Sequence, residues 1–439
     1  MLRQVCVVAC AIVATGCLPA TAAEPSPDLS HPVTPDERRL LSGDLLGKRL
    51  FEDTRLSEPQ GVSCASCHDP SSAYRGNNRS PVAAVAAGAR PGILGNRKTP
   101  SVLYMAYSPP FDFIMMKSDI TGVPEITPVG GQFWDGRAVD LSRQVEGPLL
   151  NPREMNNPSI QAVVNKVRNG PYADLAREVY GTDFFDDPGA FSKLSSAIAS
   201  YEASARFKPF SSKFDAWLEG ETNLTDQEFR GFQSFIDPKK GNCLSCHEGG
   251  HINEAMENEG PPTLPQAELS RNPKNWIFTD FTYDTLGAPR NMAIPDNANP
   301  DYFDLGLCRR PGLSEVAPKD FDRETLCGAF KTPSLRNVAL NAPYMHNGVF
   351  KTLRDAVAFY FTRDTNPERW YPRTPDGLVL KFNDLPEKYR SNVNVRQVPY
   401  DRRPGESPRA TDAEIDDIVA FLQTLTDRSF GPPAAQVLK

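Results

Sequence analysis

Cys64-Ala65-Ser66-Cys67-His68 and Cys243-Leu244-Ser245-Cys246-His247 are the stretches that decide the fold of this 439-residue chain. In each, two thiols three residues apart are followed at once by a histidine. Such thiols bond the vinyl carbons of a haem, and the histidine gives the proximal nitrogen to its iron. One copy could be a zinc or redox motif. Two copies, one in each half of an exported chain, predict two covalent haem c groups with His68 and His247 as proximal ligands.

The first 23 residues have the layout of a secretory signal peptide. A positive start at Arg3 precedes an apolar run too short to span a bilayer, and small residues close the segment at Ala20-Thr21-Ala22-Ala23. Ala14-Thr15-Gly16-Cys17 alternatively fits a lipoprotein site with a lipidated Cys17. We expect a periplasmic protein cleaved near Ala23, with the lipid anchor as the alternative.

The charge of the chain argues against a nucleic-acid partner, and its proline content indicates the kind of loops it has. The formal net charge is −7, and the chain holds 41 prolines. An acidic chain binds nucleic acid poorly, because phosphate neutralisation needs clustered Lys and Arg. We therefore expect no nucleic-acid partner, and the prolines indicate long, ordered loops.

Two cysteines remain after those of the leader and the haem motifs are set aside. Cys308 and Cys327 lie 19 residues apart. An oxidising compartment favours a disulfide between them, and two buried free thiols are the alternative.

The rest of the chain reads as mainly α, with little strand-like alternation. Apolar residues recur at helical spacing over 40–51, 141–145, 160–167, 191–207, 226–235, 353–361 and 412–425. Thr225 with Glu228, and Thr411 with Glu414, are capping-box starts.

A weak internal duplication runs through the chain. Lys98-Thr99-Pro100-Ser101 recurs as Lys331-Thr332-Pro333-Ser334, and Phe133-Trp134-Asp135-Gly136 parallels Met345-His346-Asn347-Gly348. The repeated order predicts two cytochrome c-like domains with long irregular loops, related by a pseudo-two-fold axis. We expect them over 24–210 and 211–439, behind the signal peptide.

The sixth ligand of each iron decides whether the protein is an electron carrier or an enzyme. No histidine lies between His68 and His247, and His251 is too close to His247 to return to its iron. Methionines could ligate the first iron in principle: Met105, Met115, Met116 and Met155. Without such a ligand that iron is open to peroxide or oxygen.

The duplication favours one open and one closed haem. Fourteen residues after the paired Trp134 and His346 stand Pro148 and Tyr360. Proline cannot ligate iron, whereas a tyrosine phenolate can, so Tyr360 is predicted to close the second haem. Its alternative reading is a core aromatic in an amphipathic helix.

Cleavage of an O–O bond needs a group that moves a proton. Gln144 and Glu154 flank Pro148 in the sequence, so we expect Glu154 to act as acid and base, with Gln144 as its hydrogen-bonding companion. A solvated surface glutamate is the alternative for Glu154.

Residues 133–138, 144–155 and 333–348 together resemble the bacterial dihaem cytochrome c peroxidase superfamily over nearly all of the mature chain. Its peroxidases usually have Met at the position of Tyr360, and many have a distal histidine on the first haem. Both are absent here, so the chain resembles the MauG/MbnH-like branch, which uses hydrogen peroxide to oxidise residues of a partner protein.

This resemblance implies roles for individual residues. Trp134 would relay electrons between the haems, and Gln144, Pro148 and Glu154 would form the distal pocket of the first. Tyr360 would be the distal ligand of the second. A calcium ion between the haems would bind carbonyls of Asn341 and Pro343. The family's third calcium ligand, an Asn, aligns with Lys98, two residues from Asn96.

The resemblance also implies a reaction. Peroxide would generate a bis-Fe(IV) state, and a tryptophan on a secreted partner would be oxidised, with kynurenine as one product. The alternative is a peroxidase that reduces peroxide to water with electrons from a small redox protein. That role needs a second haem of high reduction potential. A phenolate ligand lowers this potential. A pure electron carrier would need two six-coordinate irons.

Overall fold

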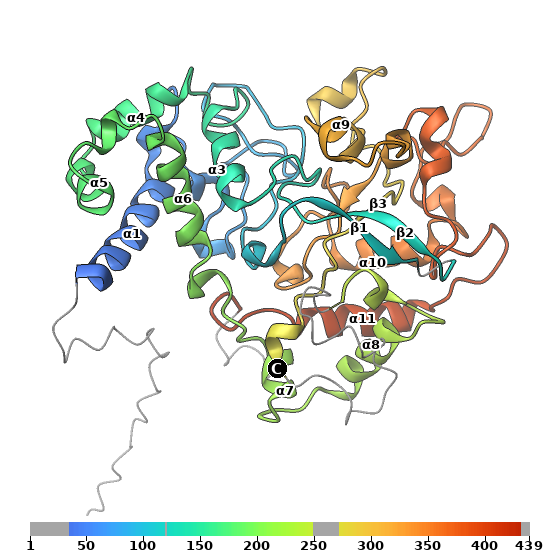
Figure 1. Ribbon diagram of the computed structural model, residues 1–439. Helices are drawn as coiled ribbons and strands as arrows, with labels where there is room; N and C mark the ends of the chain where they lie inside the picture. The colour runs from blue at the N-terminus through green and yellow to red at the C-terminus, as the bar shows by residue number, and fades with distance from the viewer. Residues whose placement is uncertain (1–34, 119–120, 249–271, 432–439) are drawn as a thin grey trace, which may run out of the picture.

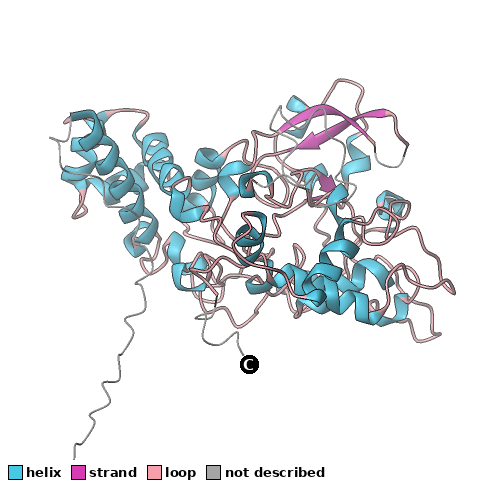
Figure 2. Ribbon diagram, turned by 90° about the horizontal axis from the view of Figure 1, so that it is seen from below, coloured by secondary structure: helices cyan, strands magenta, loops and turns pink. Residues whose placement is uncertain are grey.

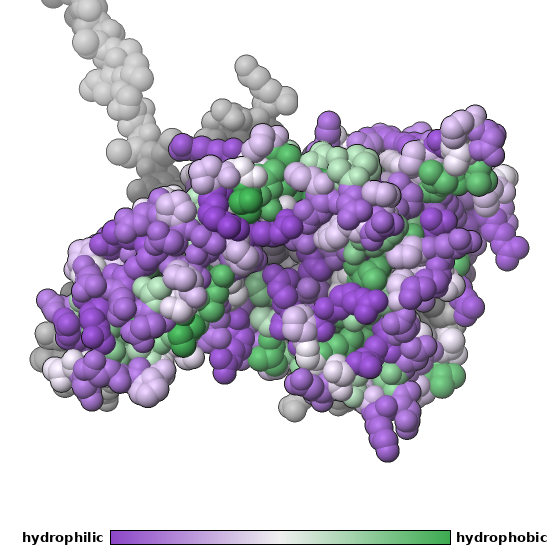
Figure 3. Space-filling model, turned by 90° about the horizontal axis from the view of Figure 1, so that it is seen from above, coloured by the Kyte–Doolittle hydropathy of each residue, from purple (hydrophilic) through white to green (hydrophobic). Residues whose placement is uncertain are grey.

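The computed structural model describes residues 35–118, 121–248 and 272–431 (Figure 1). The expected signal peptide, the alternative lipidation site at Cys17, and His251 lie outside these residues. Within the described part, no helix combines the length and apolarity needed to cross a bilayer. The face drawn in Figure 3 is mostly hydrophilic, with small apolar patches scattered over it.

Helices and irregular loops make up most of the chain, as predicted (Figure 2). The α-helices are α1 Pro35–Glu52, α2 Cys64–Cys67, α3 Leu141–Leu150, α4 Ile160–Arg168, α5 Ala173–Tyr180, α6 Ala190–Glu202, α7 Lys213–Leu218, α8 Asp226–Ile236, α9 Leu313–Val316, α10 Leu353–Thr362 and α11 Asp412–Gln423. The capping boxes at the starts of α8 and α11 are present: Thr225 accepts from the Glu228 amide, and Thr411 from the Glu414 amide.

Short 3₁₀ helices and two short antiparallel sheets also occur in the described part of the chain. β1 Asp112–Lys117 pairs with β2 Pro124–Val129, and β3 Tyr283–Asp284 pairs with β4 Phe330–Lys331. The β1–β2 hairpin was not predicted, because no residue of β1 and only two of β2 are buried, and the pattern does not alternate. It packs through Phe113 on Phe321 of the C-terminal half, with ring centroids 5.1 Å apart.

Helix α3 differs from its prediction. It continues five residues past Val145 to Leu150, although Pro148 lies inside it and lacks the amide for a helical hydrogen bond. Val145 and Leu149 are buried in the core one turn apart. Their burial offsets the missing hydrogen bond and keeps the helix intact.

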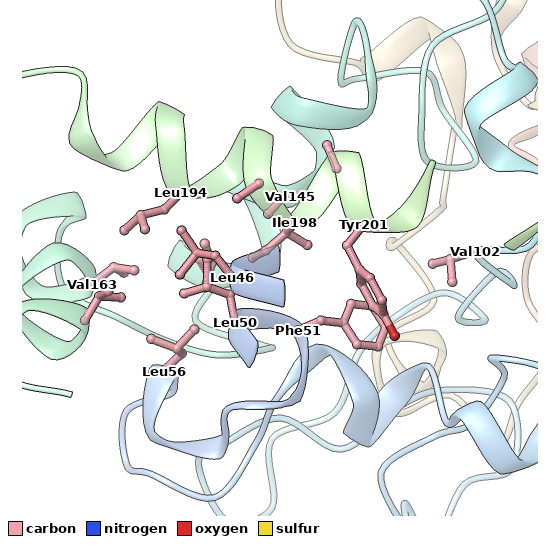
Figure 4. Packing of buried hydrophobic residues seen from close by; sticks show 14 of the residues in the cluster. Leu46, Leu50, Phe51, Leu56, Val102, Val145, Val163, Leu194, Ile198 and Tyr201 are labelled. Atoms are coloured by element: carbon pink, nitrogen blue, oxygen red, sulfur yellow. The ribbon is translucent and has the colours of Figure 1, made fainter. Parts of the chain in front are cut away.

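Each half contains a pair of helices that cross at a glycine. A Cβ added to Gly47 of α1 would lie 2.1 Å from the Ala197 carbonyl oxygen of α6, and one on Gly231 of α8 would lie 1.9 Å from that of Asp417 on α11. Figure 1 shows these two pairs in different parts of the molecule, and Figure 4 shows Leu46, Phe51, Ile198 and Tyr201 packed at the α1–α6 crossing.

The two halves have separate cores that are joined by a buried carboxylate. One core is built mainly from residues 46–207 with Ile277 and Phe281, and the other from residues 214–425. Asp427 is fully buried, and its Oδ2 accepts from Tyr104 Oη at 2.8 Å and from Asn337 Nδ2 at 2.7 Å. Tyr104 and Asn337 occupy matching positions after the repeated Lys-Thr-Pro-Ser turns.

A disulfide joins Cys308 and Cys327, which is the first of the two alternatives considered for this pair. It lies beside a small apolar cluster that includes Leu307, Leu313 and Leu326. The disulfide therefore fastens a loop-rich segment that has little secondary structure of its own.

The helix crossing at Gly47 gives a stability prediction. Gly47→Ala should lower the free energy of unfolding by about 1–3 kcal/mol or more, because the new methyl meets backbone of α6. Gly43→Ala, on the same helix, meets nothing within 4 Å and should be stabilising by about 0.5–1 kcal/mol. Thermal unfolding of the holoprotein followed by circular dichroism compares the two. Equal melting temperatures would contradict the crossing.

Candidate haem sites and peroxide pocket

The first haem motif is a single helical turn. In α2 the Ser63 amide donates to Ser66 Oγ at 3.0 Å, and the His68 amide donates to the Cys64 carbonyl at 2.8 Å. Cys64 and Cys67 stand three residues apart, so they share one face of the turn. Neither thiol is in a disulfide. The turn thus presents two thiols and an imidazole together, as covalent haem attachment requires.

The second motif forms a 3₁₀ turn, Cys243–Ser245, that ends with the same histidine-to-cysteine backbone hydrogen bond. The His247 amide donates to the Cys243 carbonyl at 2.7 Å. His247 Nδ1 lies 3.2 Å from the Phe278 carbonyl oxygen, a contact that leaves Nε2 for a metal. Burial lowers the pKa of both His68 and His247 to about 4, so both imidazoles are in the neutral form that coordinates iron.

One cavity brings together the predicted ligands of the second haem. Cys243, Cys246, His247 and Tyr360 all line it, and Trp134 from the other half forms part of its wall. Two thiols, an imidazole and a phenol around one cavity fit a covalently held haem with a tyrosine on its far side. The residues present therefore suit the cofactor that the motif predicts.

Tyr360 lies among groups that disfavour its ionisation. Its pKa is raised by burial and by the Cys246 and Cys243 thiols beside it. A phenolate would therefore form here only with a cation, such as ferric iron, to compensate. Tyr400 packs next to it, with ring centroids 5.7 Å apart, and lines the same cavity. Sequence reasoning missed Tyr400, which lies in a loop with no pattern to mark it.

Trp134 is held at the boundary of the two halves. Its indole Nε1 donates to the Lys98 carbonyl at 2.8 Å, and its own carbonyl accepts from the Lys331 amide at 2.8 Å. The Lys98 charge helps to lower the pKa of His68, after the larger effect of burial. Trp134 therefore connects the wall of the second cavity to the loop beside His68.

Glu154 is half-buried, and its Oε2 is withdrawn from solvent. Its Oε2 has no hydrogen-bond partner within the described residues, and burial raises its pKa against the opposing effects of Arg137 and Asn151. Its charge raises the pKa of Cys67, which places the carboxyl on the side of the first motif. The Ala89 amide fixes the loop by donating to the Glu154 carbonyl at 2.7 Å.

Gln144 and Pro148 lie one turn apart on α3, both partly buried. The Pro148 carbonyl accepts from the Met155 amide at 3.1 Å, which ties the helix to the residue next to Glu154. Glu154 Oε2 accepts no hydrogen bond from Gln144 or from any other of the described residues. The structure thus joins Pro148 and Glu154 through backbone, while the companion role of Gln144 stays a prediction.

Two of the candidate methionines have clear surroundings. Met155 is buried in the first core, 3% exposed. Met115 is 62% exposed on the β1–β2 hairpin, next to Met116. That hairpin packs on the C-terminal half through Phe113 and Phe321.

Glu202 is a second buried carboxyl that sequence reasoning missed. It ends α6, is 4% exposed, and its Oε2 has no partner within the described residues. Burial raises its pKa to about 8, and its charge helps to raise the pKa of Cys64. A lone glutamate at a helix end reads as solvated, so the sequence offered no signal for it.

The residues expected to bind calcium make contacts of their own in this structure. The Asn96 side-chain amide donates to Tyr302 Oη at 2.9 Å. Lys98 Nζ lies 2.7 Å from Asn341 Oδ1. Arg75 Nη1 is 3.4 Å from the Ala342 carbonyl oxygen between the two expected ligands. Two basic side chains therefore lie beside the residues expected to bind calcium, and the calcium site stays a prediction.

The raised pKa of Glu202 predicts how stability depends on pH. Between its ordinary value of 4.5 and about 8, the folded protein holds a proton that the unfolded chain releases. The stability that protonated Glu202 contributes to the fold is therefore fully present at low pH and is lost as the pH rises through about 8. Glu202→Gln should raise the melting temperature more at pH 8 than at pH 5. Glu219→Gln, an exposed helix-end control, should leave the wild-type pH trend unchanged. Parallel pH curves for Glu202→Gln and wild type would contradict the burial argument.

Comparisons with known proteins identify the family of the chain. The family model described as di-haem cytochrome c peroxidase matches residues 43–223. The methylamine utilization protein MauG of Paracoccus denitrificans is 34% identical over 395 residues, 88% of this chain and 89% of the relative. Cytochrome c551 peroxidase of Nitrosomonas europaea is 29% identical, over 74% of this chain and 73% of the relative.

A solved structure is similar throughout its length. The diheme peroxidase BthA from Burkholderia thailandensis superposes with a TM-score of 0.77 and 42% identity, covering 90% of this chain and 88% of that one. With two haem motifs, paired helix crossings and this similarity over nearly nine tenths of its length, the chain belongs to the di-haem cytochrome c peroxidase family of haem oxidoreductases that act with peroxide.

Proposed function

We propose that this periplasmic enzyme reacts with hydrogen peroxide at the haem of His68 and stores one of the two resulting oxidising equivalents at the haem of His247. The observation that carries the proposal is that Tyr360 and His247 line one cavity. At the matching position of the first half stands Pro148, which has no donor atom for iron. The two haems are therefore unequal in their access to peroxide.

Bound haem c would supply the iron that reduces peroxide and the sites that hold the oxidising equivalents. The protein's own contribution begins with Glu154. An unpartnered carboxyl oxygen with a raised pKa can take a proton from one peroxide oxygen and return it to the leaving one. The first distal pocket would thus depend on Glu154 for proton movement.

Tyr360 and Trp134 would give the second haem its role. An anionic phenolate stabilises the higher oxidation states of iron, so Tyr360 makes this haem a store of oxidising power instead of an entry point for electrons. Trp134 lies in the cavity wall and is hydrogen-bonded to the Lys98 carbonyl in the loop beside His68, so it would carry electrons between the halves.

We also propose that the chain forms two domains, 24–210 and 211–439, related by a pseudo-two-fold axis. The paired helix crossings at Gly47 and Gly231 support this relation.

The final reductant in this proposal is a residue of a secreted partner protein. The MauG-like resemblance points to a tryptophan, with kynurenine as one product, and the 34% identity to MauG supports this branch. Electrons would leave the partner by hopping through aromatic side chains, so the partner would dock on the surface without entering a haem pocket.

A second candidate is reduction of peroxide to water with electrons from a small redox protein. The 42% identity to a chain described as a diheme peroxidase favours it. Peroxide binding and the proton transfer by Glu154 are common to both candidates. They differ in which protein gives up electrons, and in whether that protein is recovered unchanged.

Glu154 can be tested independently of that choice. Glu154→Gln should slow the reaction with peroxide by about 10²–10⁴-fold, because the amide cannot accept and return the proton. Glu146→Gln is the matched control, since Glu146 lies on α3 and pairs with Arg143 at 3.1 Å. Stopped-flow absorbance of the haems gives the rates. A Glu154→Gln rate within twofold of the control would remove Glu154 from proton transfer.

Tyr360→Met distinguishes the two candidate functions. We expect wild-type holoprotein and peroxide to oxidise tryptophan in one protein of a periplasmic extract, and the methionine variant to lose this while keeping its first-haem reaction. Peptide mass spectrometry detects the product. Sustained peroxide consumption with a reduced small cytochrome, and no modified protein, would establish the second candidate instead.

A further inference from the structure

Lys98 is a buried lysine whose side chain reaches across the two halves. It is 7% exposed, and Nζ donates to Asn341 Oδ1 at 2.7 Å and to the Thr99 carbonyl at 3.2 Å. A buried amino group needs such acceptors, because leaving water without them is costly. Hydrogen bonds therefore fix the side chain between two segments that are 243 residues apart in sequence.

The same point lacks what a divalent cation would require. Calcium prefers six to eight oxygen ligands, usually with carboxylates among them. Here the oxygens of Asn341 and Thr99 already accept from Lys98, and Arg75 Nη1 lies 3.4 Å from the Ala342 carbonyl. Because like charges repel most strongly at buried positions, Lys98 and Arg75 would both oppose a metal ion.

We propose that the Lys98 amino group occupies the place of a metal ion between the two halves, so that this enzyme needs no calcium. The amino group ties the turn after residue 97 to Asn341, as a shared cation would tie ligands from both halves. Burial and Arg75 lower the pKa of Lys98 to about 7. The ammonium and the amine both keep N–H groups for the same acceptors, so the position stays filled on either side of neutral pH.

This tether bears on Trp134. The Lys98 carbonyl accepts from the indole Nε1, and the Lys98 amide donates to the His346 carbonyl at 2.8 Å. Lys98 thus fixes Trp134 through its backbone and Asn341 through its side chain. It is a positioning residue for the path between the haems, and this inference does not depend on which protein supplies the electrons.

The repeat supplies a control. Lys331 occupies the matching position in the second Lys-Thr-Pro-Ser turn and is also buried, at 5% exposure. Its Nζ donates to the Gly131 carbonyl and lies 3.4 Å from Ser108 Oγ, so it does not contact Asn341. Lys331→Asn therefore makes the same chemical change without opening the Asn341 site.

The experiment measures calcium directly. Wild-type holoprotein, treated with chelator and desalted, should contain well under 0.1 calcium per chain by plasma mass spectrometry, and millimolar calcium should not change its melting temperature or haem spectrum. Lys98→Asn should melt several degrees lower without calcium, bind about one calcium per chain and recover its melting temperature with it. Lys331→Asn should bind none.

Two results would overturn the proposal. One is stoichiometric calcium in the wild type whose removal lowers the melting temperature. The other is a destabilised Lys98→Asn protein that calcium does not rescue, which would show that the position requires the lysine itself and not a cation. If Lys98→Asn fails to fold, the wild-type metal content and chelator response still decide the question.

Discussion

Two reciprocal backbone hydrogen bonds join the halves of the molecule, and the rest of the site depends on them. The Lys98 amide donates to the His346 carbonyl, and the Lys331 amide donates to the Trp134 carbonyl, both at 2.8 Å. Each lysine opens a copy of the same Lys-Thr-Pro-Ser turn. Because each turn is hydrogen-bonded to the other half, the two haem motifs and Trp134 are held in one frame. Asp427 adds a second link, since it accepts hydrogen bonds from Tyr104 and Asn337, which follow the two turns.

Within this shared frame, we propose that single side chains make the two haem sites unequal. Trp134 stands where the second half has His346, and Pro148 where it has Tyr360. Glu154 and Glu202 are buried carboxyls near the first motif, whereas the second motif faces Tyr360 and Tyr400. Carboxyls near the first motif and tyrosines in the cavity of the second would suit peroxide reduction and charge storage, respectively.

Local sequence signals predicted much of this structure. The haem motifs, the capping boxes at Thr225 and Thr411, and the repeated turns each depend on a few adjacent residues. The misses depend on tertiary contacts: α3 continues through Pro148 because Val145 and Leu149 are buried, and Glu202 and Tyr400 have no local pattern. The hydrogen bond from Lys98 to Asn341 was not predicted either, because only the fold brings these two residues together. Burial of charge is decided by residues far apart in sequence, which one sequence does not reveal.

The central claim is that the haem of His68 is open and the haem of His247 is closed by Tyr360. Electron paramagnetic resonance of the ferric holoprotein, before and after stoichiometric peroxide, tests it most directly. The account predicts one high-spin and one low-spin haem, with both signals lost and a near-infrared charge-resonance band appearing after peroxide. Two low-spin haems in the resting protein would contradict it.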